Sequence, residues 1–189
     1  DLKLILIDPK GVEFKNYRRI PHLQRPIITD SGEALEAFRW AYKEMEKRFK
    51  RLDRLGRDLD GRPELFPRLV IAVDEYSLVA KGKEKSQINK IIFELVSKGK
   101  SCGIHLVITA STLRATTIPT RIKAIISSRL CFNVASVAES KIAIDTTGAE
   151  KLLGNGDGLY MSPYNSNLER FQAAYVSNTE VKRALKFVR

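Results

Sequence analysis

A short apolar run that ends in two acids constrains the fold of this chain more than any other feature. Residues 69–73 are apolar at every position, and Asp74 and Glu75 follow directly. Such a run is typical of a strand in a parallel sheet with helices on both of its faces. Side chains at the carboxyl end of that kind of strand point into the crevice where ligands bind. The run therefore predicts an α/β fold with an acidic pair at the ligand-binding edge of its sheet.

Other apolar segments predict strands and helices in alternation. Strands are expected at residues 2–7, 104–109, 130–134, 158–161 and 171–176. Helices are expected over residues 35–52 and 88–96, after Ser136 and after Ser177. This alternation is typical of an α/β fold with a mostly parallel sheet flanked by helices. Because no linker or repeat interrupts the pattern, we expect one domain over residues 1–189.

The longest predicted helix has recognisable signals at both ends. Its apolar residues recur at three-and-four spacing, at Leu35, Phe38, Tyr42, Met45, Phe49 and Leu52. Asp30 followed by Glu33 predicts the N-cap, and Gly56 predicts the C-terminal end. The helix is therefore expected to begin near residue 30 and to end near residue 56.

Charge and composition favour some classes of partner and argue against others. Lys and Arg total 33 against 22 Asp and Glu, which gives a net charge of +11. This excess favours a polyanion, nucleic acid first, although an inert basic surface fits the charge equally well. Cys102 and Cys131 are too few for a disulfide framework, and His22 and His105 have no ligand partner at metal spacing. No apolar stretch is long enough to cross a bilayer, so we expect a soluble, cytoplasmic segment.

Two adjacent acids at this position have distinct known roles in nucleotide hydrolysis. Asp74 can hold Mg²⁺ through a water molecule, and Glu75 can polarise the water that attacks the terminal phosphate. This is the Walker B arrangement. The motif alone leaves open an ordinary strand end capped by acids.

Nine stretches of the chain follow the order of sequence blocks in a known motor domain. They are LILIDPKGVEF, IPHL, RWAYKEMEKRFKRL, LVIAVDEY, GIHLVITA, IK, SRLCFNV, GAEKLLGNGD and FQAAYVSNTEV. Over almost its full length the chain resembles the FtsK/SpoIIIE motor domain. The resemblance implies a RecA-like P-loop NTPase core that uses ATP and Mg²⁺. It also implies a homo-oligomeric ring, usually a hexamer, that moves double-stranded DNA, with a membrane anchor often far upstream. Chromosome segregation, sporulation, conjugation and secretion are all processes open to such a motor.

The same resemblance implies catalytic roles for particular residues. Asp74 and Glu75 match the Walker B pair in residue type. Lys100 falls where the family has an arginine that reaches the neighbouring subunit's phosphate, but a lysine cannot form the forked contact of an arginine. Ser111 stands where the family has a glutamine that senses the γ-phosphate, and a serine is shorter.

Nucleotide and DNA contacts are also implied. Lys141 replaces a family arginine and, with Asp74 and Gly148, makes up the expected cofactor-binding set. Thr112 replaces another arginine. Two basic loops are expected to face DNA, with Lys81, Lys83 and Lys85 in one and Thr112, Arg114, Arg121 and Lys123 in the other. For each basic residue taken singly, a solvated surface position is the alternative.

No run in the chain satisfies the glycine-rich Walker A pattern. Gly99-Lys100-Ser101 imitates its end, but Glu94 occupies the position of the first glycine, and a helix precedes it where a strand is needed. In the family that loop lies shortly before the LILIDPK block. We therefore expect the first strand and the P-loop to be missing from this chain, and ATPase activity to belong to the full-length parent. Two alternatives stay open, namely a degenerate module that binds DNA or partner subunits without hydrolysing ATP, and a secretion-type ATPase of the same fold.

Overall fold

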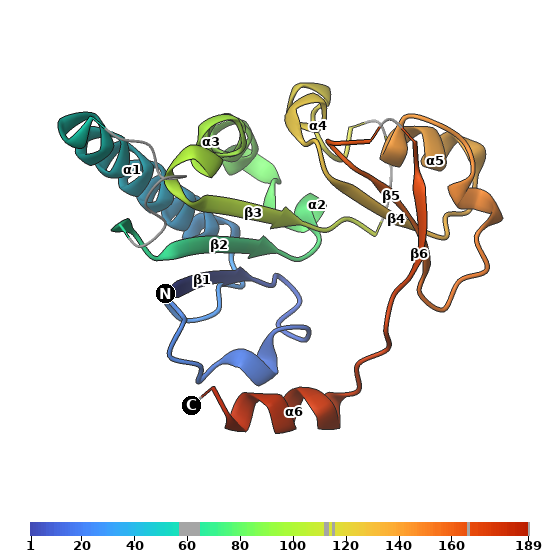
Figure 1. Ribbon diagram of the computed structural model, residues 1–189, viewed down its shortest axis with the longest axis horizontal. Coiled ribbons are helices and arrows are strands. Elements are labelled where there is room, and N and C mark those ends of the chain that lie inside the picture. Colours follow the sequence, from blue (N-terminus) through green and yellow to red (C-terminus); the bar gives the residue numbers. More distant parts are fainter. Residues whose placement is uncertain (57–64, 112–113, 115, 166, 189) are drawn as a thin grey trace. The chain divides into compact units, whose positions relative to one another are not determined.

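The computed structural model describes residues 1–56, 65–111, 114, 116–165 and 167–188 (Figure 1). They form two compact units, one made of Asp1–Ser111 with Lys182–Arg189 and the other of Thr112–Val181. The expectation of a single domain over residues 1–189 stays a prediction.

The first unit is built on a parallel sheet of three strands. These are β1 (Leu2–Ile7), β2 (Arg68–Val73) and β3 (Ile104–Ile108), in the order β1-β2-β3. The register pairs Ile7 with Val73 and Val73 with Ile108. The parallel sheet that the apolar run predicts is confirmed. Its register places the carboxyl ends of all three strands at one edge, where Asp74 follows β2.

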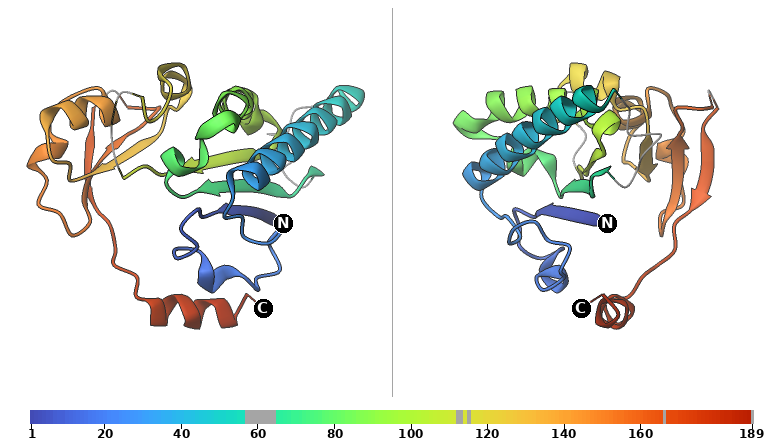
Figure 2. Two further views of the ribbon diagram at one scale, coloured as in Figure 1. Left: turned by 180° about the vertical axis from the view of Figure 1, so that it is seen from behind. Right: turned by 60° about the vertical axis from the view of Figure 1, so that its left-hand side comes forward.

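Two long helices, α1 (Ser31–Leu55) and α3 (Lys85–Lys98), pack on one face of this sheet (Figures 1 and 2). The ends of α1 are those that the sequence predicts. Asp30 Oδ1 accepts the backbone N–H groups of Gly32 and Glu33 at 2.7 and 3.2 Å, and Gly56 closes the helix in the left-handed conformation. A cap of this kind is worth about 1 kcal/mol. The buried side of α1 carries Ala34, Leu35, Ala37, Phe38, Ala41, Met45, Arg48 and Leu52.

The two faces of the parallel sheet are buried to different extents. In β2 the alternate residues Leu69, Ile71 and Val73 are buried, whereas Val70 and Ala72 between them are half-buried. On the strand beside them, Val107 is 52% exposed and pairs with Ala72. Helical cover of both faces, which the apolar run predicts, is therefore complete on one face only among the described residues.

A turn after β1 closes the outer edge of the sheet. Asp8 is fully buried, and its carboxylate accepts the N–H groups of Gly11 at 2.8 Å and Phe14 at 3.0 Å. The chain then passes through the 3-10 helix η1 (Lys15–Tyr17) and returns beside β1 through parallel bridges at Leu23 and Ile28. The turn that Asp8-Pro9-Lys10-Gly11 predicts is thus present, with Asp8 as its internal acceptor.

The second unit contains a separate antiparallel sheet. Its strands are β4 (Arg129–Phe132), β5 (Asp157–Met161) and β6 (Glu169–Gln172), with α4 (Thr120–Ile125), α5 (Val137–Ile144) and the 3-10 helix η5 (Ala149–Lys151). Cys131, Ile144, Ala149 and Leu152 form its core. The sequence pattern predicts these strands but not their separate antiparallel pairing, and β6 lies earlier than the predicted 171–176.

Short elements complete the chain: α2 (Tyr76–Val79), η3 (Gly82–Glu84), η4 (Gly99–Cys102) and α6 (Asn178–Lys186). The predicted capping pair before α6 is confirmed, because Glu180 Oε2 accepts the N–H of Ser177 at 2.8 Å and the Glu180 N–H reaches Ser177 Oγ at 3.3 Å. None of the helices in the described ranges combines the length and the apolar character that crossing a membrane requires.

Candidate active site

Asp74 and Glu75 lie where β2 ends and α2 begins, at the carboxyl edge of the parallel sheet, as the sequence predicts. The Asp74 N–H continues the ladder to β1 by donating to the Ile7 carbonyl at 2.9 Å. Glu75 then turns the chain with a φ of +51°, a left-handed value that is uncommon for residues other than glycine. Asp74 is half-buried and Glu75 is only 5% exposed. The chain thus changes direction at the acid pair itself.

The Glu75 carboxylate is held by three donors. Oε1 accepts the Ser77 hydroxyl at 2.7 Å, and Oε2 accepts both the Ser111 N–H at 2.9 Å and the Ser111 hydroxyl. Burial acts to raise the pKa of Glu75, but the hydrogen bonds from Ser111 and Ser77, with the charge of Lys10, outweigh it and bring the pKa below its ordinary value. Glu75 is therefore ionised at neutral pH and can only accept hydrogen bonds.

Thr109, which directly follows β3, contacts the whole segment that carries the acids. Its hydroxyl oxygen accepts the Glu75 N–H at 3.0 Å and donates to Asp74 Oδ1 at 3.0 Å. Its backbone N–H donates to the Val73 carbonyl, and its carbonyl accepts the Tyr76 N–H, both at 2.9 Å. One residue of the neighbouring strand therefore bonds to four consecutive residues of the acid segment.

The structure brings one of the two other predicted catalytic residues to the acids. Ser111 lies directly on Glu75. Lys100 does not, because it is an exposed residue of η4, which precedes β3 and so lies at the amino end of a strand parallel to β2. Asp74 follows the carboxyl end of β2, at the opposite edge of the sheet. Within one copy of the chain, Lys100 and the acid pair are therefore separated by the length of the sheet.

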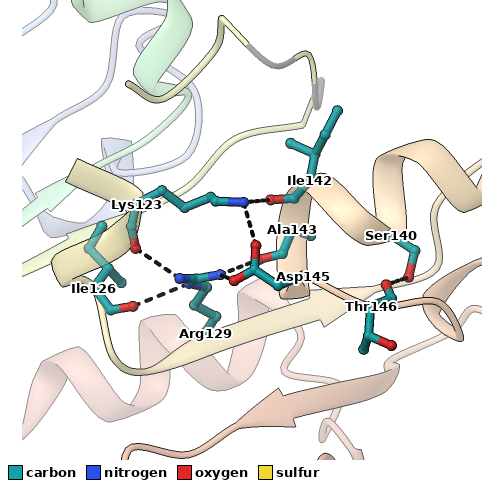
Figure 3. A network of polar contacts seen from close by, with 8 residues as sticks. All are labelled: Lys123, Ile126, Arg129, Ser140, Ile142, Ala143, Asp145 and Thr146. Carbon is teal, nitrogen blue, oxygen red and sulfur yellow. Dashed lines mark hydrogen bonds and ion pairs between the residues drawn. The ribbon is translucent and has the colours of Figure 1, made fainter. Parts of the chain in front are cut away.

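The residues predicted to face DNA differ in their surroundings. Lys81, Lys83 and Lys85 are exposed around η3, shortly after α2. In the second unit Arg114 and Arg121 are also exposed, and Thr112 lies outside the described residues. Lys123 is engaged internally, since its ammonium donates to the Ile142 carbonyl at 3.0 Å and to Asp145 Oδ1 at 2.6 Å (Figure 3).

Lys123, Arg129 and Asp145 form what we call the Asp145 cluster (Figure 3). The Arg129 guanidinium reaches Asp145 Oδ2 at 2.5 Å and the Lys123 carbonyl at 2.8 Å, so it joins the end of α4 to the end of α5. The hydrogen bond from Lys123, followed by that from Arg129, lowers the pKa of Asp145. Beside the cluster, the fully buried Ser140 donates to the Thr146 carbonyl at 2.8 Å. Sequence reasoning missed Arg129 and Asp145, because their pairing depends on the antiparallel unit.

The predicted cofactor residues Lys141 and Gly148 belong to the second unit. Lys141 is exposed on α5. Gly148 has a φ of +128°, which a side chain would strain, and its N–H donates to Glu150 Oε2 at 2.8 Å. A nucleotide contact for either residue stays a prediction.

Sequence reasoning also missed Thr109, Ser77 and Lys10. The signal for Thr109 was its place as the last residue of a predicted strand, since the carboxyl ends of parallel strands meet at one edge. Ser77 is close to Glu75 in the chain, but its contact depends on the left-handed turn at Glu75. No local pattern encodes that turn.

The donor atoms at this edge suit Mg²⁺ held together with a nucleotide. Asp74 offers hard carboxylate oxygens, one of which is bonded to Thr109. No group of three or more His, Cys, Asp or Glu side chains among the described residues is arranged to enclose a metal ion. Mg²⁺ commonly binds through one or two carboxylates, waters and substrate phosphates. Asp74 therefore fits the metal role that the sequence predicts for it.

Comparison with known proteins identifies relatives of this chain among DNA translocases. A family model described as the FtsK/SpoIIIE family matches residues 1–60. The chain is 39% identical over 200 residues to the DNA translocase FtsK of Borreliella burgdorferi and 40% identical over 202 residues to that of Treponema pallidum. It is 36% identical over 202 residues to the DNA translocase SftA of Bacillus subtilis. Each match covers 100% of this chain, which spans 25%, 25% and 21% of those proteins.

Solved structures agree on the fold. The conjugation coupling protein TcpA of pCW3, in a monomer form with ATPgS, superposes with a TM-score of 0.85 at 24% identity, over 100% of this chain and 57% of that chain. ATPases 2 and 3 of EssC from Geobacillus thermodenitrificans give a TM-score of 0.80 at 19% identity, over 98% of this chain and 36% of that chain. The expected RecA-like P-loop NTPase fold is thus confirmed. The family model over residues 1–60 and the similarity to FtsK and SftA along the whole chain support an FtsK/SpoIIIE family motor domain.

Proposed function

We propose that this chain supplies part of an ATP-driven motor that moves double-stranded DNA, with Asp74 and Glu75 as its hydrolytic acids. The relatives named DNA translocases support this reading. The observation that carries it is the arrangement at the sheet edge, where a buried, ionised Glu75 lies next to a more accessible Asp74. An acid that is both buried and ionised suits the polarisation of a water molecule.

Each acid would have a distinct task. When bound, Mg²⁺ would neutralise the charge that develops on the phosphates during transfer. Asp74 would hold that ion through a water molecule, with the carboxylate sites that Thr109 does not occupy. Glu75 keeps its pKa low through Ser111 and Ser77, and so orients and polarises the attacking water rather than acting as a strong base.

The surfaces predicted to contact DNA suit a motor that travels over any sequence. The exposed lysines around η3 and the exposed Arg114 and Arg121 provide positive charge within a chain of net charge +11. Contacts to phosphate carry no base readout, so they hold the duplex without selecting a sequence. Lys123 contributes differently, because its ammonium is already bound within the Asp145 cluster. The role that we propose for Lys123 is to stabilise the position of α4.

The place of Lys100 favours an assembly of several copies. Because Lys100 lies at the opposite end of the sheet from Asp74, it serves a phosphate bound to a neighbouring copy rather than its own. A closed homo-oligomeric ring, a hexamer by the family resemblance, provides each copy with such a neighbour. A lysine supplies a single positive charge at that contact and not a forked pair of hydrogen bonds.

ATP turnover in the full-length protein, measured with and without duplex DNA, tests the proposal. Glu75→Gln keeps the shape of the side chain and removes its charge, so DNA-stimulated turnover should fall by about a hundredfold or more. Glu94→Gln is the matched control, since Glu94 pairs with Lys98 on the same helix α3 and the loss of its charge should leave turnover unchanged. Equal turnover in Glu75→Gln and the wild type contradicts the assigned role.

A second function is favoured by Ser111 and Lys100, the two departures from the family's catalytic residues. A module that binds DNA or partner subunits without hydrolysis would keep the basic surfaces and tolerate both changes. It predicts DNA binding with a steep salt dependence in the full-length protein, but no ATP turnover. A secretion-type motor predicts turnover with a shallow salt dependence of DNA binding. The two measurements together therefore separate all three functions.

A further inference from the structure

We propose that Thr109 is a positioning residue of the hydrolytic site, which holds Asp74 and Glu75 in a single arrangement relative to each other. The inference rests on the proposed function, since its effect is observed through ATP hydrolysis. It assigns Thr109 a role that acts through the two acids rather than through contact with the nucleotide.

The first support is the pattern of the bonds. Thr109 donates its N–H to the Val73 carbonyl and accepts the Tyr76 N–H at its carbonyl. Between these two backbone bonds, its side chain contacts both acids. The backbone of Thr109 is therefore held on both sides, and one side-chain torsion, which is restricted in a β-branched residue, sets the position of the hydroxyl.

The second support is the directionality of the hydroxyl. A threonine hydroxyl has one hydrogen to donate and lone pairs that accept. At Thr109 the lone pair takes the Glu75 N–H at 3.0 Å, and the hydrogen goes to Asp74 Oδ1 at 3.0 Å. The hydrogen bonds thus run in one direction, from the amide of Glu75 through the hydroxyl to the carboxylate of Asp74. Valine has the same shape as threonine but can make neither bond.

The third support is the turn at Glu75. Its φ of +51° is uncommon for an L residue, and such a conformation persists where the surrounding structure stabilises it. Thr109 binds the N–H of Glu75 and the N–H of the next residue, Tyr76. This turn directs the Glu75 carboxylate toward the hydroxyls of Ser77 and Ser111. Thr109 therefore determines the direction of Glu75 as well as the orientation of Asp74.

The consequence for hydrolysis is geometric. Thr109 holds one oxygen of Asp74, so the remaining acceptor sites of that carboxylate have one orientation, in which they would hold Mg²⁺ through a water molecule. Glu75 must polarise a different water at the same time. A displacement of about 1 Å between groups that act together can cost about a hundredfold in rate. Loss of the shared hydroxyl should therefore affect both the metal dependence and the maximum rate.

The test compares Thr109→Val and Thr109→Ser in the full-length protein. DNA-stimulated ATP turnover is measured across Mg²⁺ concentrations at saturating ATP, and thermal unfolding is recorded for each variant. Thr109→Val should lower maximum turnover by about tenfold to a hundredfold and raise the Mg²⁺ concentration for half-maximal turnover severalfold. Thr109→Ser keeps the hydroxyl and should stay within about threefold of the wild type in both.

Further variants show whether the loss of the Thr109 hydroxyl itself causes the changes in rate and Mg²⁺ dependence. Thr179→Val, at an exposed position of α6, is the matched control and should change neither quantity. Thr109→Ala removes the hydroxyl without placing a methyl group where it stood, so it must agree with Thr109→Val if the hydroxyl is responsible. A Thr109→Val protein with the wild-type rate and Mg²⁺ dependence overturns the inference, and so does a Thr109→Ser protein as impaired as Thr109→Val. If Glu75→Gln also retains full turnover, the proposed function itself fails; if only Thr109→Val does, that function stands without this role.

Discussion

Ser111 donates both its backbone N–H and its hydroxyl to the same carboxylate oxygen of Glu75. Ser111 is also the residue that directly precedes the loop expected to face DNA. The residues proposed for hydrolysis and those proposed for DNA contact are therefore adjacent in the sequence at Ser111.

Ser111→Ala removes the hydroxyl donor and keeps the backbone N–H. Because hydrogen bonds from Ser111 are the largest of the effects that lower the pKa of Glu75, that pKa should rise in the variant. The acidic limb of the pH profile of ATP turnover should then move to higher pH. Ser86→Ala, at an exposed position of α3, should leave the profile in place.

The lowered pKa of Glu75 also affects the stability of the fold. A carboxyl with a lowered folded-state pKa contributes stability above its unfolded-state pKa and loses it as the pH falls through the folded-state value. Ser111→Ala should therefore reduce the fall in the free energy of unfolding on acidification. An identical pH dependence of urea unfolding in wild type and variant argues against this contribution of the hydroxyl.

Replacement of Lys81, Lys83 and Lys85 by glutamine tests the first DNA surface. Each phosphate contact changes the slope of log affinity against log salt by about 0.9, so loss of three contacts should reduce the slope by roughly 3. The matched control is Lys43, Lys47 and Lys50 to glutamine, an equal loss of charge at exposed positions of α1. Equal slopes for both triple variants would place DNA elsewhere on the molecule.

Asp145→Asn tests the Asp145 cluster. The substitution removes the charge that pairs with Lys123 and with Arg129, whose side chain is only 13% exposed. Because a charge with little solvent loses its partner, the free energy of unfolding should fall by about 1–2 kcal/mol. Asp53→Asn, exposed near the end of α1, should change it by less than about 0.5 kcal/mol.

The cluster also has a pH signature. The pKa of Asp145 is lowered in the folded state. Its contribution to the free energy of unfolding is therefore present above the unfolded-state pKa and declines as the pH falls through the folded-state pKa. The difference in unfolding free energy between wild type and Asp145→Asn should therefore shrink at acidic pH. A difference that is constant with pH contradicts an electrostatic role for Asp145.

Arg48→Met tests a buried cation in the first unit. Arg48 is 3% exposed and donates to Glu44 Oε1 and to the Cys102 carbonyl, both at 3.0 Å. Methionine fills a similar space but leaves the carbonyl without this donor, so the free energy of unfolding should fall by about 2–3 kcal/mol. Arg54→Met, at an exposed position of the same helix, is the control in urea unfolding. Equal stability of the two variants would show that the buried contacts of Arg48 add nothing.

Local patterns in the sequence predict the parts of the fold that depend on neighbouring residues. The apolar run 69–73, the N-cap at Asp30 and the glycine at residue 56 encode their own strand and helix ends, and the structure has them there. The family resemblance places the acids at Asp74 and Glu75. Both kinds of inference depend on residues that are close in sequence or in fixed order.

Features that depend on register could not be predicted in the same way. Thr109 reaches Asp74 only because β2 and β3 pair in one particular register, which the sequence does not state. Lys123 and Asp145 meet because the second unit has its own antiparallel sheet, whereas continued alternation of strands and helices suggests a parallel one. A basic residue expected to contact DNA is consequently found in an internal ion pair.

Asp8 is an acid that the site does not use. Like Asp74 it follows the carboxyl end of a strand at this edge, but it has no exposed surface and both of its oxygens accept backbone N–H groups. A second accessible carboxylate beside Asp74 would enrich the edge in protein oxygens, the environment preferred by Ca²⁺, which takes six to eight oxygen ligands. By keeping Asp8 inside its turn, the chain leaves an edge poor in protein ligands. On the proposed function, such an edge would favour Mg²⁺, which keeps several of its waters and binds together with substrate phosphates.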